Sequence, residues 1–246
     1  MIKWKRTDIP CRMAAFEETS MGVWAIVPVK PLRRGKSRLA SVLSATERAL
    51  LNQNLLLRTL QVLSQVEEIE QVLVVSRDSE ALALARRHGA RTLQERGDSR
   101  LNLALRHATT LLQMYHVGVM MILPADLPLL EADDVRALLA AVGHPPSVVL
   151  APDRHGEGTN ALVVAPPGLM PYQYGPGSFA RHVAAAREAG VEPRIVERQG
   201  LAWDLDWPED LEALRAMGVQ DSLREVLRRT DPPSDSMERA HVFPKG

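Results

Sequence analysis

Short apolar runs alternate along the chain with longer segments whose apolar residues recur every three or four positions. The runs are typical of buried strands, and the spaced segments are typical of helices with one face in a core. Strands are predicted at residues 23–29, 72–75, 119–123, 148–150, 161–164 and 194–196. Helices are predicted after Ser44 and at residues 79–88, 101–115, 133–142, 179–189 and 209–217. This alternation predicts an α/β domain with a mostly parallel sheet covered on both faces.

Polar and glycine residues mark the ends of several predicted helices. Ser44 and Glu47 have the spacing of a capping box, in which each side chain bonds a backbone amide of the other residue. Gly89 and Gly190 stand where C-terminal caps are expected. The helix that follows Ser44 carries leucines at spacings of four and three, so its core face is defined by sequence alone.

The 246 residues are ordinary for one α/β domain, and neither an internal repeat nor a linker divides them. Residues 1–21 lack a clear period, and we interpret them as an N-terminal extension. A single α/β domain is predicted at 22–218, and residues 219–246 are predicted as a C-terminal helix and a mobile tail rich in Pro, Ser and charge.

Composition narrows the classes of function. The chain has 30 Lys and Arg and 30 Asp and Glu, and this zero balance argues against a general nucleic-acid binder. A single cysteine, Cys11, excludes an intramolecular disulfide and a cysteine-based zinc site. No run approaches the roughly 18 apolar residues of a membrane span, and the N-terminus lacks the apolar core of a signal peptide. A cytoplasmic location without a membrane partner is therefore expected.

The first predicted strand leads directly into a loop rich in cations. Lys30, Arg33, Arg34, Lys36 and Arg38 could together neutralise a triphosphate at the carboxyl edge of the sheet. The loop ends in Gly-Lys-Ser but lacks the upstream glycine of a Walker P-loop. A solvated basic turn is the alternative, and the charge pattern alone does not decide between them.

Aspartates follow two other segments. Asp126 stands between two prolines directly after a buried strand, and Asp204 and Asp206 alternate across Leu205, so both would point to one side of an extended segment. Such carboxylates suit Mg²⁺, which takes one or two carboxylates together with substrate phosphate and water. The alternative is that each aspartate is only a turn former or a helix cap.

Two glycine-rich turns could form anion sites. Residues 153–162 offer free amides, the Thr159 hydroxyl and the Asn160 amide, and residues 174–179 open a helix at Ser178. Two connecting turns are the simpler alternative. His155 and His182 lie nearby, and the pattern gives neither a catalytic role.

These motifs occur together in one order: Val-Pro-Val-Lys-Pro-Leu, Lys-Ser-Arg-Leu, Pro-Ala-Asp-Leu-Pro-Leu, Gly-Thr-Asn-Ala-Leu, Gly-Pro-Gly-Ser-Phe and Asp-Leu-Asp-x-Pro-Glu-Asp-Leu. In this respect residues 22–218 closely resemble the 2-phospho-L-lactate / phosphoenolpyruvate guanylyltransferase family of deazaflavin coenzyme F-420 biosynthesis. The resemblance implies a single Rossmann-like three-layer domain of the nucleotide-diphospho-sugar transferase fold. It also implies transfer of GMP from GTP to a small phosphorylated acid, with Mg²⁺ as cofactor.

The resemblance also implies roles for residues. Lys30, Lys36 and Arg38 would meet the GTP phosphates, and Asn102 would contact the nucleoside. Asp126 and Asp206 would hold Mg²⁺, with Asp204 as a third candidate. Thr159, Gly175 and Ser178 would hold the acceptor, with Asn160 nearby. Gly35 departs from the alanine expected in the family, which should loosen the loop.

Two alternatives follow from these residues. The acceptor could be phosphoenolpyruvate, 2-phospho-L-lactate or 3-phospho-D-glycerate. The chain could also be a nucleotide-binding regulatory protein without turnover, although the presence of all three aspartates argues against it. A molybdenum-cofactor-type guanylyltransferase is disfavoured, because its Leu-Ala-Gly-Gly start is missing. The oligomeric state stays open, with a homodimer as one alternative.

Overall fold

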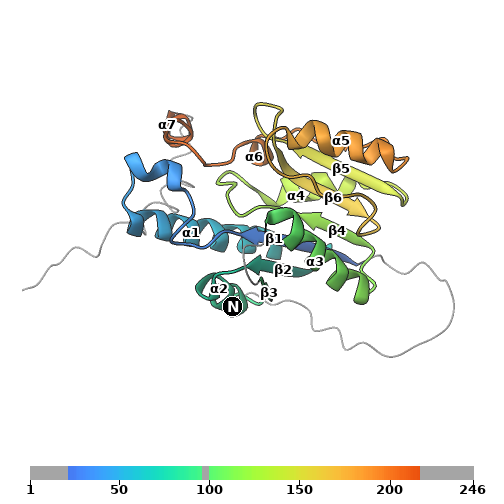
Figure 1. Cartoon of the computed structure of the whole chain (residues 1–246), viewed down its shortest axis with the longest axis horizontal. Coiled ribbons are helices and arrows are strands. Elements are labelled where there is room, and N and C mark those ends of the chain that lie inside the picture. Colours follow the sequence, from blue (N-terminus) through green and yellow to red (C-terminus); the bar gives the residue numbers. More distant parts are fainter. Residues whose placement is uncertain (1–21, 96–99, 217–246) are drawn as a thin grey trace, which may run out of the picture.

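The computed structural model of the chain describes residues 22–95 and 100–216 (Figure 1). The predictions for residues 1–21 and 219–246 lie outside this part. Its sheet has seven strands in the order β3-β2-β1-β4-β6-β5-β7. The strands are β1 (Val23–Val29), β2 (Ile69–Ser76), β3 (Arg91–Gln94), β4 (Val119–Ile122), β5 (Ser147–Pro152), β6 (Thr159–Ala165) and β7 (Arg194–Ile195). The helices are η1 (Ser37–Ser41, a 3₁₀ turn), α1 (Ala45–Ser64), α2 (Ser79–Arg87), α3 (Leu101–Met114), α4 (Ala132–Ala140), α5 (Ser178–Glu188), α6 (Gln199–Ala202) and α7 (Pro208–Ala216).

The mostly parallel sheet is confirmed. β1 pairs in parallel with β2 and with β4, whereas β6 runs antiparallel to both of its neighbours, β4 and β5. β6 is reversed because it returns from β5 through a short turn, without a crossover helix. The N-terminus of β6 therefore lies at the same edge of the sheet as the carboxyl ends of β1 and β4.

The two faces of the sheet have separate cores. Along β1, Ala25 and Val27 pack on one face with side chains from α1, α2 and α4. Trp24 and Ile26 pack on the other face, where α3 and α5 cover the sheet (Figure 1). Both faces of the strand are buried, which explains why it appears in the sequence as a continuous apolar run.

A third core cluster supports the edge that carries the predicted site. Leu205 and two leucines of α7 pack against Leu39 of η1 and against Leu51 and Leu55 of α1. This packing holds the C-terminal segment of the described chain across the cationic loop.

The helix boundaries follow the predicted caps. Ser44 and Glu47 form both bonds of the capping box, and Gly89 and Gly190 have φ of 84° and 78°. Short elements escaped prediction, namely η1, β3 and α6, because they have too few apolar residues to show a period. No helix in the described ranges is long and apolar enough to cross a membrane.

Candidate active site

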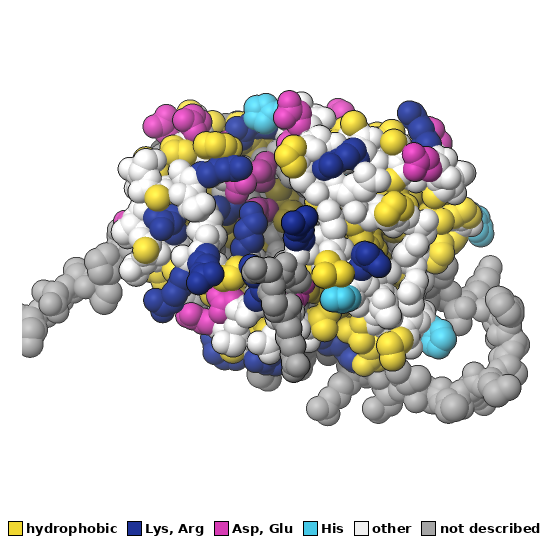
Figure 2. Space-filling view, in the orientation of Figure 1, with side chains coloured by type: hydrophobic (Ala, Val, Ile, Leu, Met, Phe, Trp, Pro, Cys, Tyr) yellow, Lys and Arg dark blue, Asp and Glu magenta, His cyan; other side chains and the backbone are white. Residues whose placement is uncertain are grey.

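A cleft opens at the carboxyl edge of the sheet, between the loop after β1 and the segments that follow β2, β3 and β4. Its volume is about 460 Å³, within the range of small-molecule sites. Figure 2 shows Lys and Arg side chains gathered around a hollow in the middle of this face, with carboxylates among them. The residues that line the cleft are Pro28, Val29, Lys30, Pro31, Arg34, Gly35, Lys36, Asn52, Val75, Arg77, Glu95, Leu101, Ala104, Pro124, Ala125, Asp126 and Asp206.

The loop after β1 is held at its middle. The Leu32 amide donates to Asp78 Oδ2 at 2.8 Å, and Asn52 Nδ2 donates to the Leu32 carbonyl at 2.7 Å. A Cβ at Gly35 would come within 2.6 Å of the same Asn52 nitrogen. An alanine at position 35 would therefore disturb the side chain that anchors the loop, so glycine suits this loop in this chain.

Lys36 joins the two aspartates that the sequence places 80 residues apart. Its Nζ donates to Asp126 Oδ2 at 3.1 Å and to Asp206 Oδ1 at 2.8 Å. The Lys36 side chain is only 6% exposed, and its backbone has φ of 55°, which turns it back over the sheet edge. Three predicted site residues thus meet at one point.

The electrostatics of this group follow from burial and opposite charge. Burial lowers the pKa of Lys36, but the carboxylates of Asp126 and Asp206 outweigh it, so the net pKa is raised. Burial raises the pKa of Asp206, but the Lys36 ammonium outweighs it and the net pKa is lowered. The pKa of Asp204 is raised, by burial and then by the charge of Asp126. The surroundings of Asp204 therefore disfavour its charged form.

The other cations of the loop differ in where their side chains lie. Lys30 and Arg34 line the cleft, whereas Arg33 points to Glu80 at 3.8 Å and is 81% exposed. Arg38 lies 3.4 Å from Asp206 and stacks over the Trp207 ring.

The segment that carries Asp206 is fixed by groups that the sequence did not reveal. The Leu205 amide donates to the Asp126 carbonyl at 3.0 Å, which sets the two aspartate segments side by side. Asp210 Oδ2 accepts the amides of Asp206 and Trp207 at 2.8 and 2.7 Å, and its other oxygen pairs with Arg154. Asp210 lies in the first turn of α7, and its partners, which are two amides before the helix and the distant Arg154, could not be found in sequence.

A buried polar cluster lies at the start of β6. Ser178 Oγ accepts the Thr159 amide at 3.0 Å, and Thr159 Oγ1 lies 2.9 Å from His182 Nδ1. The Gln173 amide donates to His182 Nε2 at 2.9 Å, so the proton of the neutral ring is on Nδ1 and points to Thr159. Burial, and secondarily Arg181, lowers the pKa of His182 to about 4. The ring is thus neutral at pH 7 and orients the Thr159 hydroxyl.

The amides expected to be free in the turn before β6 are mostly occupied. Asp153 accepts the amides of His155, Glu157 and Gly158, at 3.0, 2.9 and 2.8 Å. The expectation of an anion site made of these amides is therefore wrong, because the turn satisfies its own donors. The Phe179 amide, in the first turn of α5, is also taken, by the Glu157 carbonyl.

Two predicted contacts bond to backbone groups. Asn160 Nδ2 donates to the carbonyls of Leu201 and Ala202. Asn102 accepts the Tyr174 amide at 2.9 Å and donates to its carbonyl at 3.2 Å, which ties the loop of Gly175 to the start of α3. Both residues position segments around the site, and their contact with a ligand stays a prediction.

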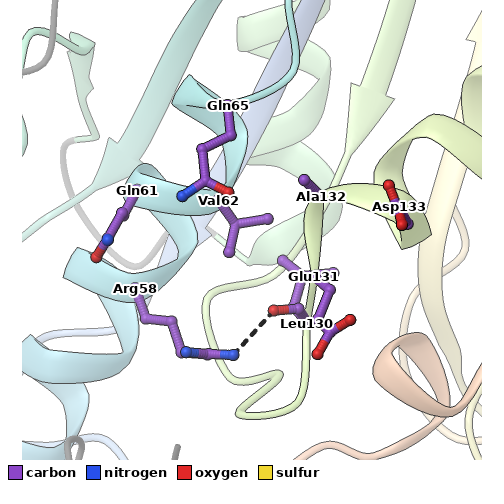
Figure 3. Close-up of a pocket in the computed structure, with 8 residues that line it drawn as sticks. All are labelled: Arg58, Gln61, Val62, Gln65, Leu130, Glu131, Ala132 and Asp133. Atoms are coloured by element: carbon purple, nitrogen blue, oxygen red, sulfur yellow. Dashed lines mark hydrogen bonds between the residues drawn. The ribbon is translucent and has the colours of Figure 1, made fainter.

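A smaller pocket of about 310 Å³ lies between α1 and the start of α4 (Figure 3). Arg58 crosses it and donates to the Leu130 carbonyl at 3.2 Å. Leu130 belongs to the segment that follows Asp126, so this bond ties that segment to α1.

The donor set of the cleft fits a hard divalent cation. Asp126 and Asp206 converge on a position now taken by the Lys36 ammonium, and both supply oxygen ligands of the type that Mg²⁺ prefers. In residues 22–95 and 100–216 no three His, Cys, Asp or Glu side chains gather to hold a metal by themselves. Such a cation would need further oxygens from substrate.

Comparison with known proteins agrees with this geometry. Residues 23–241 match the family described as "Guanylyl transferase CofC like". A phosphoenolpyruvate guanylyltransferase of Rubrobacter xylanophilus is 46% identical over 198 residues, which cover 80% of this chain and 96% of the relative. One from Sphaerobacter thermophilus is 42% identical over 190 residues, with coverage of 77% and 91%.

Solved structures support the fold. A protein of Desulfovibrio desulfuricans G20, assigned as a nucleotide-diphospho-sugar transferase, superposes with a TM-score of 0.68 at 17% identity, covering 86% of this chain and 99% of that one. A CMP:2-keto-3-deoxy-manno-octonic acid synthetase complexed with CTP gives 0.54 at 14% identity, with coverage of 81% and 99%. The predicted fold class and family resemblance are both confirmed. The match over most of the chain, and the identity to relatives along nearly their whole length, show that this protein belongs to the CofC-like guanylyl transferase family.

Proposed function

We propose that this chain transfers GMP from GTP to the phosphate of phosphoenolpyruvate, releasing pyrophosphate, as a step of coenzyme F-420 biosynthesis. The observation that carries the proposal is the convergence of Lys36, Asp126 and Asp206 at one end of a cation-lined cleft. The names of the relatives favour phosphoenolpyruvate over 2-phospho-L-lactate and 3-phospho-D-glycerate as the acceptor.

The reaction needs positioning and charge neutralisation rather than a base. A phosphate oxygen of the acceptor attacks the α-phosphorus of GTP, a new P–O bond forms, and the bond to the β-phosphate breaks with pyrophosphate leaving. The acceptor phosphate is already anionic near neutral pH, so no side chain has to remove a proton. Catalysis then depends on in-line geometry and on the cations that face the phosphates.

The side chains divide this work. Lys30, Lys36 and Arg38 would neutralise the triphosphate, and the Thr159 and Ser178 hydroxyls would hold the acceptor beside Gly175. Asp126 and Asp206, with Asp204 as a third candidate, would hold Mg²⁺, which would supply charge neutralisation at the phosphates when bound.

The test is release of pyrophosphate from GTP and Mg²⁺ with each of the three acceptors, and with ATP and CTP as nucleotide controls. Release with GTP and phosphoenolpyruvate is expected from the wild type and should be nearly absent in Asp126→Asn. Asp133→Asn, which changes an exposed aspartate of α4 that is 74% accessible, is the matched control. A folded wild-type protein that binds GTP but releases no pyrophosphate with any acceptor would favour a nucleotide-binding regulatory protein instead.

A further inference from the structure

The far end of the cleft has a different character from the phosphate end. Val75, Leu101 and Ala104 line it together with Arg77 and Glu95. Leu101 is 39% exposed although it is apolar. A flat apolar group packed on it would remove this surface from water. Lys36, Asp126 and Asp206 lie together at the opposite end.

The strand order sets the distance between the two ends. Glu95 follows β3 and Asp126 follows β4, and β2 and β1 lie between them. Three strand spacings amount to about 14 Å. That length accommodates a base, its ribose and the first phosphates when the phosphates lie at Lys36.

Glu95 presents an unused acceptor in this end of the cleft. Its amide donates to the Ser76 carbonyl at 3.0 Å, so the backbone is fixed to the end of β2. Its Oε1 is buried and has no hydrogen-bond partner among the residues that the structure describes. A buried acceptor without a partner costs free energy, which a donor on a ligand would recover.

We propose that the Glu95 carboxylate reads the base of the nucleotide by accepting hydrogen bonds from N1–H and the 2-amino group of guanine. A carboxylate accepts but does not donate. Guanine alone among the common bases offers two adjacent donors on one edge, whereas adenine and cytosine pair a single amino donor with a ring acceptor. The inference rests on the proposed use of GTP and names the residue that selects guanine.

The experiment measures equilibrium binding of GTP, inosine triphosphate, xanthosine triphosphate and ATP, with Mg²⁺ and without acceptor, by calorimetry. Inosine lacks the 2-amino donor, so the wild type should bind it on the order of 10- to 100-fold more weakly than GTP. Glu95→Gln replaces one acceptor by an amide donor. Because xanthine has an oxygen where guanine has the amino group, this variant should prefer xanthosine triphosphate to GTP.

Glu188→Gln, at an exposed position of α5, is the matched control and should bind like the wild type. A Glu95→Gln protein that keeps the wild-type ratio of GTP to inosine triphosphate would overturn the inference, and so would equal weakening for every nucleotide. These outcomes are separable from failure of the proposed function. If the wild type releases pyrophosphate and Glu95→Gln keeps the wild-type ratio of GTP to inosine triphosphate binding, only the role of Glu95 in base selection is refuted. If the binding ratios are as expected but no pyrophosphate is released, only the proposed reaction is refuted.

Discussion

Replacing Lys36 by Met tests whether the ammonium is the counter-ion that holds Asp126 and Asp206 together. Methionine keeps the length of the side chain and removes its charge. The lysine is 6% exposed, and its partners are 30% and 25% exposed, so the loss leaves two partly buried carboxylates facing one another. We expect the folded protein to lose stability when no metal is present.

The magnitude follows from the burial of the pair. Removing one partner of a fully buried ion pair costs about 3–5 kcal/mol. Because water reaches part of both carboxylates, we expect a smaller loss, about 2–3 kcal/mol. A divalent cation should restore most of this, since a ligand at 100 times its dissociation constant stabilises by about 2.7 kcal/mol. The variant should also bind Mg²⁺ more tightly than the wild type, in which the metal must displace the ammonium.

Urea unfolding in EDTA and in excess Mg²⁺ measures both effects. Arg33→Met, which removes a cation of the same loop that is 81% exposed and lies near Glu80, is the control and should unfold like the wild type in EDTA. A Lys36→Met protein as stable as the wild type in EDTA would refute this counter-ion role. Equal stabilisation of the two proteins by Mg²⁺ would refute it as well.

Three further predictions concern other parts of the structure. The pKa of His182 is lowered from its ordinary 6.5 to about 4, by burial and then by Arg181. Between these two values the unfolded chain therefore binds a proton at this histidine and the folded chain does not. The free energy of unfolding should therefore fall by about 3 kcal/mol as the pH drops from about 6.5 to below 4; urea titrations of His182→Gln should lack this slope, and an unchanged slope would assign it elsewhere. Gly175 has φ of 125°, and the new Cβ of Gly175→Ala would lie 3.3 Å from Arg181 Nη2. In steady-state kinetics this variant should raise the KM for the acceptor about tenfold and change the KM for GTP little. A raised KM for GTP with an unchanged KM for the acceptor would contradict the placement of the acceptor at Gly175. Ser44→Ala removes the cap of α1 and should lower the free energy of unfolding by about 1 kcal/mol, measured by thermal unfolding. An unaltered Tm would show that the capping box with Glu47 contributes no stability.

Local patterns sufficed for the long elements. The apolar run 23–29 coincides with β1, and the helix caps at Ser44 and Gly89 lie where the spacing of polar residues predicted them. Such features depend on neighbours within a few residues, whose interactions are the same in any fold. Tertiary contacts stabilise the short elements: β3 is held by the sheet, and α6 by the segment before Asp204. The hydrophobic period of such short segments does not indicate these contacts.

The candidate site likewise depends partly on local sequence and partly on tertiary structure. Charge and motif order indicated Lys36, Asp126 and Asp206 as site residues. The fold brings them together at 3.1 and 2.8 Å, and their roles toward phosphate and Mg²⁺ stay predictions. Only the fold determined that Asp153 accepts hydrogen bonds from the amides of its own turn and that Asn102 bonds to the backbone of Tyr174. The identity of residues in a motif is local information, whereas the partner that satisfies each hydrogen bond depends on which segments the sheet order brings together. For that reason the sequence alone determined the class of chemistry, and the tertiary structure decided which polar groups remain available to a ligand.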